Sequence, residues 1–165
     1  MEVNFETKRM VVTPVRTATG LADLAAPWIT GDATRFLPPH LQLTADQPDA
    51  DIWCERLLAE AQVSAARMKT QESCAGLLIL NQMDGPRGTE LHLGYILAQS
   101  HWGQGLGTEL VRGLVDWAQS HEVAALMGGV EDGNPASAAI LRKLGFAASD
   151  RRADSTMYRL EVVKA

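Results

Sequence analysis

The sequence predicts an α/β domain of the α+β type, in which helices flank one largely antiparallel sheet. Three observations carry this prediction. Apolar runs at 73–83 and 89–97 enclose the turn segment Asp-Gly-Pro-Arg-Gly, a pattern typical of a hairpin. Apolar residues recur at helical spacing over 106–118. The apolar run 123–130 follows that helix, which provides the crossover needed for parallel pairing with 89–97.

The N-terminal half is predicted to hold one strand and two helices. The strand covers residues 5–15, with Pro14 ending it or confining it to a sheet edge. A short helix over 20–29 is broken by a proline near its end, and two consecutive prolines make 34–43 a loop. A long second helix is predicted from Asp49 to Lys69. Its buried face comprises Trp53, Leu57, Leu58, Ala61, Ala65 and Met68.

The C-terminal part continues with a helix and two strands. Asn134 caps this helix, Pro135 occupies its first position, and Gly145 ends it. Strands at 146–149 and 156–163 are joined by a charged link as a hairpin. We find no repeat or linker, so residues 1–165 are predicted to form a single domain.

Composition narrows the class of protein. Of 165 residues, 46 % are apolar and 21 % charged, and the net charge is −5, so broad nucleic-acid binding is not expected. Cys54 and Cys74 lack the spacing of a metal site or disulfide and are predicted to be free thiols. No signal peptide or membrane-spanning run is recognisable, which predicts a cytoplasmic protein without membrane contact.

The segment 102–108 is the most informative stretch. Gly103, Gly105 and Gly107 alternate between a strand and a helix. Backbone N–H groups at a helix start are unpaired and favour an anion, so a pyrophosphate could lie on them. A tight turn without a ligand explains the glycines equally well. Dinucleotide and phosphate-loop motifs do not fit, because the third glycine is one position early and no lysine follows it.

Two motifs resemble one family. The strand Gly94–Leu97 followed by 102–108 is similar to the acetyl-CoA-binding signature of the GNAT N-acetyltransferases. Asn134, Ser137 and the closing Leu-Gly-Phe of the last helix resemble the family's second motif. The subfamily resembled is the ribosomal-protein N-terminal acetyltransferase type, and the whole chain follows its element order. Trp102 departs from the general signature, which has Gln or Arg there.

The resemblance implies transfer of an acetyl group from acetyl-CoA to a primary amine by direct attack. The acceptor is a protein or peptide N-terminus or a small amine. Backbone at 96–98 would donate to the thioester oxygen, amides at 103–108 would bind phosphate, and Asn134 would contact pantetheine. The cofactor-binding residues implied are Ile96, Leu97, Ala98, Trp102, Gly103, Gln104, Gly105, Leu106, Gly107, Thr108, Asn134 and Ser137.

For the general base, His92 is the first choice and Glu90 the second, since both lie on the strand face opposite Leu91 and Leu93. An imidazole with a pKa near 6.5 suits a base at neutral pH, although a hydrogen-bonded hairpin histidine is an equal alternative. Ser137 is the candidate for stabilising the leaving thiolate, because Leu141 occupies the position where many family members have tyrosine. The alternative is a small residue in the first helical turn.

Three aromatic residues are candidates for the acceptor pocket. Trp28 and Phe36 lie on or near the proline-rich loop, although they could simply attach it to the core, and Tyr95 lies on the glycine-motif strand. A second functional hypothesis is a catalytically silent acyl-CoA-binding or sensor domain, which would keep the glycine turn but lack a working base. The chain is also compatible with a homodimer formed through its C-terminal strands.

Overall fold

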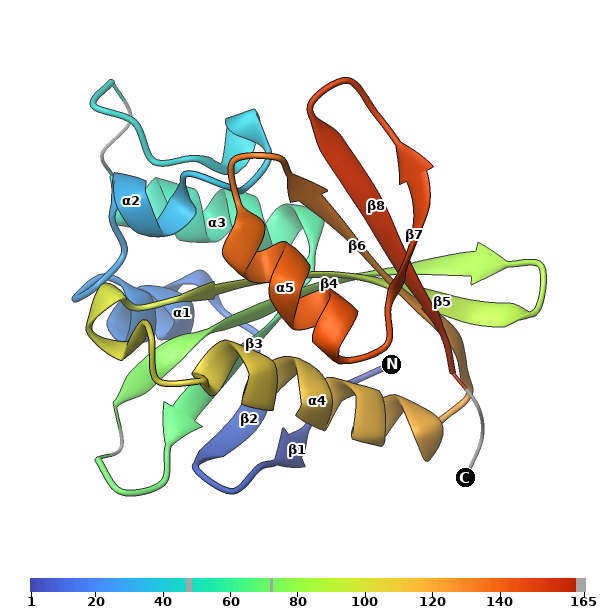
Figure 1. Cartoon of the computed structure of the whole chain (residues 1–165). Helices are drawn as coiled ribbons and strands as arrows, with labels where there is room; N and C mark the ends of the chain where they lie inside the picture. The colour runs from blue at the N-terminus through green and yellow to red at the C-terminus, as the bar shows by residue number, and fades with distance from the viewer. Residues whose placement is uncertain (47–48, 72, 163–165) are drawn as a thin grey trace.

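The computed structural model describes residues 1–46, 49–71 and 73–162 (Figure 1). Its strands are β1 (Phe5–Glu6), β2 (Met10–Val15), β3 (Gln62–Met68), β4 (Cys74–Gly85), β5 (Gly88–Leu97), β6 (Val123–Glu131), β7 (Ala147–Arg151) and β8 (Ser155–Glu161). Its helices are α1 (Ala18–Ala25), α2 (Gly31–Thr34), α3 (Ala50–Glu60), α4 (Leu106–Gln119) and α5 (Pro135–Lys143), with 3₁₀ turns η1 (Pro39–Leu41) and η2 (Gln99–His101).

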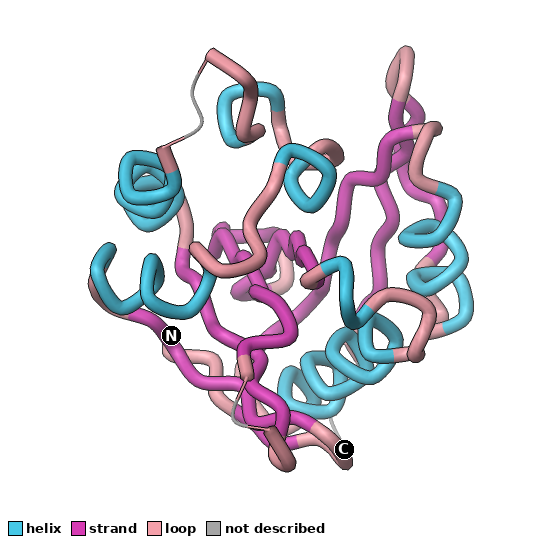
Figure 2. The backbone as a smooth tube through the Cα atoms, turned by 90° about the vertical axis from the view of Figure 1, so that its left-hand side faces the viewer, coloured by secondary structure: helices cyan, strands magenta, loops and turns pink. Residues whose placement is uncertain are grey.

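The strands form one mixed sheet in the order β1-β2-β3-β4-β5-β6-β8-β7. Helices α4 and α5 cover one face, and α1 and α3 cover the other (Figures 1 and 2). Only the β5–β6 pair is parallel among the described strands, and α4 is its crossover. The predicted α+β class and the largely antiparallel sheet are therefore confirmed.

The prediction of a helix from Asp49 to Lys69 is wrong in its second half. Helix α3 ends at Glu60, and residues 62–68 form β3, between β2 and β4. Val63, Ser64, Ala65 and Ala66 are all buried, because helices pack on both faces of this central strand. A strand buried on both faces shows no polar–apolar alternation. The apolar residues of β3 therefore also matched the helical spacing of the preceding segment and were assigned to the same helix.

The predicted opening strand is divided into β1 and β2 by a tight turn. The Thr7 amide donates to the Met10 carbonyl over 2.8 Å, and the Met10 amide donates to the Thr7 hydroxyl over 2.9 Å. Strand β1 pairs only with Val11 and Val12 of β2. Pro14 pairs with β3 on one side and lies beyond β1 on the other, an edge position that tolerates its missing N–H.

The remaining predicted elements are present. Strands β4 and β5 form the expected hairpin, closed by Pro86 and Arg87, and β7 and β8 form the C-terminal one. The predicted last strand reached Val163, which lies outside the described residues; β8 ends at Glu161. Asn134 caps α5 by accepting from the Ser137 amide over 3.2 Å.

The sheet separates two hydrophobic clusters. Leu78 and Leu80 of β4 face the cluster with α4 and α5, whereas Leu77 and Ile79 face the cluster with α1 and α3. Cys54 and Cys74 lie in the second cluster as free thiols, as predicted. No helix in the described part of the chain is long and apolar enough to cross a bilayer.

Candidate functional site

The centre of the sheet opens where β5 and β6 diverge. Strand β5 pairs with β4 as far as Leu97, and β6 pairs with β8 as far as Glu131. Pairing between β5 and β6, however, stops at His92 and Met127 (Figure 1). We call the gap between 93–97 of β5 and 128–131 of β6 the fork. Its two strands expose backbone groups toward one another without pairing.

The direction of those backbone groups follows from strand alternation. The Ala98 amide donates to the Ala75 carbonyl of β4 over 2.9 Å. Since N–H and C=O groups alternate sides along a strand, those of Leu93, Tyr95 and Leu97 point toward the fork. The Leu97 carbonyl accepts from the Trp102 indole over 2.8 Å, which leaves the Leu97 N–H as the donor facing the fork. Of the predicted segment Ile96–Ala98, Leu97 has the orientation to bind a thioester oxygen.

A cavity of about 870 Å³ follows the fork. Its lining includes residues of the glycine turn and α5, namely Trp102, Gly103, Gly105, Leu106, Gly107, Thr108, Asn134 and Ser137. It also includes residues of the α2–η1 segment and the C-terminal hairpin, among them Arg35, Phe36, His40, Arg152, Ser155 and Met157. Strand β5 contributes His92, Tyr95, Ile96 and Leu97. Ala98 and Gln104, both predicted to bind cofactor, are not part of the lining.

The glycine turn has the geometry of an anion site. Gly103 and Gly105 have φ values of 72° and 75°, which glycine adopts far more readily than other residues. Gly105 is the N-cap of α4 and offers no side-chain cap, so the first amides of α4 have no helical partner. No atom comes within 4 Å of a Cβ placed on Gly103. A diphosphate therefore fits against bare backbone at the positive end of a helix dipole.

A polar triad of Tyr95, Asn134 and Ser137 lies beside the fork. The Tyr95 hydroxyl donates to Ser137 Oγ over 3.0 Å, and Asn134 Nδ2 donates to the same oxygen over 3.1 Å. Burial raises the pKa of the Tyr95 phenol, and the hydrogen bond to Ser137 opposes that rise. Because Ser137 Oγ accepts both bonds, its own hydrogen is free to be donated into the cavity.

His92 lies where the fork begins and lines the cavity. Burial lowers the pKa of its imidazole below the ordinary 6.5, and the positive charge of Arg152 lowers it further. The ring is therefore neutral at pH 7 and able to accept a proton. No described residue hydrogen-bonds with the imidazole, so its nitrogens are open to a substrate.

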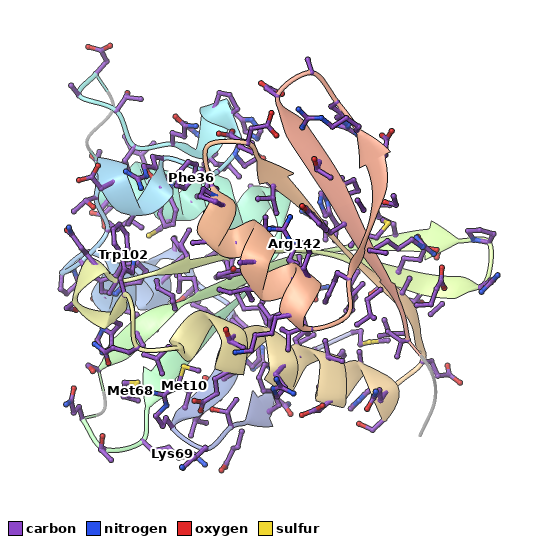
Figure 3. The ribbon with its side chains drawn as sticks, viewed as in Figure 1. Met10, Phe36, Met68, Lys69, Trp102 and Arg142 are labelled. Carbon is purple, nitrogen blue, oxygen red and sulfur yellow. The ribbon has the colours of Figure 1, made fainter. Side chains whose placement is uncertain are left out.

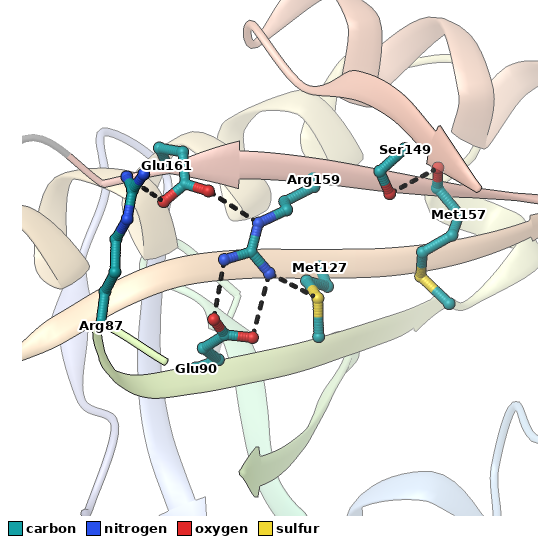
Figure 4. A network of polar contacts seen from close by, with 7 residues as sticks. All are labelled: Arg87, Glu90, Met127, Ser149, Met157, Arg159 and Glu161. Carbon is teal, nitrogen blue, oxygen red and sulfur yellow. Dashed lines mark hydrogen bonds and ion pairs between the residues drawn. The ribbon is translucent and has the colours of Figure 1, made fainter. Parts of the chain in front are cut away.

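Glu90 has a different environment from the one predicted for a base. Only 4 % of the residue is exposed, it does not line the cavity, and both carboxylate oxygens accept from Arg159, over 2.7 and 3.0 Å (Figure 4). These bonds hold the pKa of the Glu90 carboxyl below its usual value. Arg159 also bonds Met127 and Glu161, so the carboxylate ties β5 to β6 and β8.

Of the three aromatic residues predicted for the acceptor pocket, Phe36 and Tyr95 line the cavity and Trp28 does not. Phe36 lines the cavity under the Arg35 guanidinium, whose carbon lies 4.6 Å from the ring centre. Figure 3 shows Phe36 near the start of α5 and Trp102 at the glycine-turn end. Trp28 is not part of the lining; it packs against the cluster with α1 and α3, and its indole donates to the Leu24 carbonyl over 2.9 Å.

From the sequence, the C-terminal hairpin is expected to contribute to the pocket, but none of its lining residues, such as Arg152, Ser155 and Met157, was identified. Their only signal is the charged link around residues 150–154, which is typical of any exposed turn. Among the described residues, no three His, Cys, Asp or Glu side chains are grouped so that they could bind a metal.

Comparison with protein families gives a match to the acetyltransferase (GNAT) domain over residues 9–147. Two curated relatives are L-methionine sulfoximine/L-methionine sulfone acetyltransferases of Pseudomonas aeruginosa and Pseudomonas paraeruginosa. Each is 35 % identical over 63 residues, which are 38 % of this chain. The matched stretch spans only about a third of the relatives' length, 36 %.

Solved structures share the fold at low sequence identity. A GNAT acetyltransferase of Bacillus anthracis superposes with a TM-score of 0.77 at 9 % identity, covering 96 % of this chain and 98 % of that one. A probable acetyltransferase of Chromobacterium violaceum also gives 0.77, at 18 % identity over 98 % and 87 % of the two chains. RimL, a ribosomal L7/L12 alpha-N-protein acetyltransferase solved with coenzyme A, gives 0.75 at 14 % identity over 97 % and 98 %.

Proposed function

Because this chain belongs to the GNAT acetyltransferase family, we propose that it transfers an acetyl group from acetyl-CoA to a primary amine by direct attack. The observation that carries the proposal is the continuous cavity along the fork. It connects a glycine turn suited to phosphate with a neutral, unpartnered histidine.

The residues at the fork fit acyl-CoA part by part. The amides of residues 103–108 would bind the diphosphate, and pantetheine would enter the fork from there beside the backbone of β5, as a short neighbouring strand does. Acetyl-CoA supplies the activated acetyl group. The Leu97 N–H is placed to donate to the thioester oxygen as negative charge develops there.

His92 is the proposed base. An α-amine is largely protonated at neutral pH, with a pKa of about 8, so a base aids attack. The neutral form of the amine attacks, and His92 accepts the proton that its nitrogen loses as the C–N bond forms and the C–S bond breaks. Ser137 stabilises the departing thiolate with its hydroxyl hydrogen, which Tyr95 and Asn134 leave free. Glu90 is not proposed as the base, because Arg159 occupies its oxygens.

We infer that the acceptor carries an α-amine, either on a small molecule or at a protein N-terminus. The curated relatives are named for acetylation of amino-acid derivatives, which supports the small-molecule class. The resemblance to ribosomal-protein N-terminal acetyltransferases supports the peptide class. The cavity lining joins the aromatic ring of Phe36 with the cations Arg35 and Arg152 and with the carboxylates of Asp32, Glu60 and Glu131, so it offers contacts for an apolar group and for groups of either charge.

Thermal unfolding with acetyl-CoA, CoA, NAD and ATP in parallel tests the cofactor. A ligand at a hundred times its dissociation constant adds about 2.7 kcal/mol of stability. We expect shifts with acetyl-CoA and CoA alone. Stabilisation by neither form of CoA would contradict the cofactor assignment.

Thiol release from acetyl-CoA with a panel of free amino acids, N-terminal peptides and polyamines then tests the acceptor. Release with α-amines supports the proposal. CoA binding without release for any amine would favour the silent acyl-CoA-binding domain instead.

A further inference from the structure

Arg9 connects the N-terminal turn to the glycine turn. It lies between β1 and β2, 95 positions before Gln104, yet its Nη1 donates to the Gln104 carbonyl over 2.9 Å. Its Nη2 lies 3.8 Å from the point where a Cβ on Gly105 would be. Arg9 itself does not line the cavity, so this contact comes from behind the turn.

Glu109, in the first turn of α4, fixes the guanidinium. Its Oε2 accepts from Arg9 Nε over 2.7 Å, and its Oε1 accepts from the Arg9 amide and the Thr7 hydroxyl, each over 2.7 Å. The Glu109 side chain is 17 % exposed and that of Arg9 39 %. Charge-assisted hydrogen bonds are stronger than neutral ones, so this cluster is the firmest tie between the β1–β2 turn and α4.

The bond to Gln104 determines which way a neighbouring amide points. In a trans peptide the C=O and the following N–H point in opposite directions. With the Gln104 carbonyl directed at Arg9, the Gly105 N–H is directed to the opposite side, and Gly105 lines the cavity. Gly105, which follows this peptide at a φ of 75°, restricts its rotation less than any other residue would, so an outside contact helps to hold it.

We propose that Arg9 is a positioning residue for acyl-CoA binding: it holds the 104–105 peptide so that the amides of the glycine turn face the diphosphate. The inference rests on the proposed function, since it assumes a diphosphate on the glycine turn. It differs from a general structural role, because its effect is confined to the ligand's phosphate end.

The test compares Arg9→Ala with a matched control, Arg16→Ala. Arg16 also pairs with a glutamate, Glu2, but this pair is exposed and neither residue lines the cavity. Dissociation constants for CoA and for pantetheine, which lacks the diphosphate and nucleotide, are measured by calorimetry. Steady-state rates are measured with acetyl-CoA and with S-acetylpantetheine.

We expect Arg9→Ala to weaken CoA binding about tenfold, the order of one charge-assisted hydrogen bond. KM for acetyl-CoA rises in parallel while kcat stays within about twofold. Pantetheine binding and turnover of S-acetylpantetheine are unchanged, and Arg16→Ala behaves as wild type. Arg9→Lys recovers part of the affinity, because one ammonium cannot bridge Glu109 and the Gln104 carbonyl as a planar guanidinium does.

Equal losses for CoA and pantetheine, or no loss for CoA, would overturn the inference. If Arg9→Ala does not fold, the same comparison of CoA and pantetheine affinities is made with Arg9→Lys and tests the inference. Failure of the proposed function is separate, because it appears in the wild type as absent CoA binding or absent acetyl transfer.

Discussion

Replacing Arg159 with methionine leaves the Glu90 carboxylate buried without its cationic partner. The Glu90 side chain is 5 % exposed, so little water can replace the two lost hydrogen bonds. Methionine keeps most of the volume of arginine's aliphatic part. The substitution therefore isolates the charge pair that ties β5 to β8 across β6 (Figure 4).

Removing one partner of a buried ion pair costs about 3–5 kcal/mol. The lower end applies, because the Arg159 side chain is 23 % exposed and some water reaches the pair. For a domain of 165 residues each kcal/mol shifts Tm by about 3 °C, so a loss of about 3 kcal/mol predicts a fall of about 9 °C.

The dependence on pH has a definite sign. The folded pKa of Glu90 lies below 4.5, so the pair stabilises the wild type above that pH and its contribution is lost on acidification. In Arg159→Met burial raises the pKa of the same carboxyl, so acid favours the variant. The difference in Tm between the two proteins is therefore larger at pH 7 than at pH 4.

Calorimetric or fluorescence melts of wild type, Arg159→Met and Glu90→Leu/Arg159→Met provide the measurement. The double variant should recover most of the loss, because no charge remains buried. Glu161→Gln is the control for the exposed part of the network and should lower Tm by no more than about 2 °C. Thiol-release rates well below the melting transition should stay within about twofold of wild type.

A Tm unchanged by Arg159→Met would refute the reasoning about the buried pair.

Three further predictions concern the site. His92→Ala should lower kcat about a hundredfold or more at saturating acetyl-CoA, and the wild-type rate should fall on acidification through a pKa below 6.5, since a protonated imidazole accepts no proton. An unaltered kcat would place the base elsewhere. Ser137→Ala should lower kcat about tenfold without raising KM, and Tyr95→Phe less, because Asn134 still orients Ser137. Equal rates in all three proteins would exclude this serine from thiolate stabilisation. Gly105→Ala, at a φ of 75°, should cost about 1 kcal/mol of stability and weaken CoA binding in calorimetry, whereas Gly88→Ala, at 125° in the hairpin, should affect stability alone. Full CoA affinity in Gly105→Ala would count against the glycine turn.

Local patterns in the sequence predicted much of the fold and the position of the glycine turn. The β4–β5 hairpin, α4, and the capped start of α5 each depend on residues close together in the chain. The glycine turn is local as well, and its positive φ values follow from the same spacing.

The features that sequence reasoning misplaced depend on distant partners. Strand β3 lies between two other strands, and nothing within residues 62–68 signals that burial on both faces. Glu90 was the second candidate for the general base because it shares a strand face with His92. Arg159, which donates to its carboxylate, comes 69 positions later in the chain. The Arg9–Glu109 pair joins residues 100 positions apart, so no local spacing in the sequence predicts it.

If pantetheine lies in the fork as proposed, the sheet is paired along the whole length of β5 and β6 only in the complex. Strands β1 to β5 and strands β6 to β8 share only the register pairs from Thr89 to His92. A pantetheine lying between them would complete the interrupted ladder as a strand borrowed from the substrate. Substitutions that tighten acyl-CoA binding would then also strengthen the link between the two halves of the sheet. In each turnover the departing CoA would remove this pairing, and the next acetyl-CoA would restore it.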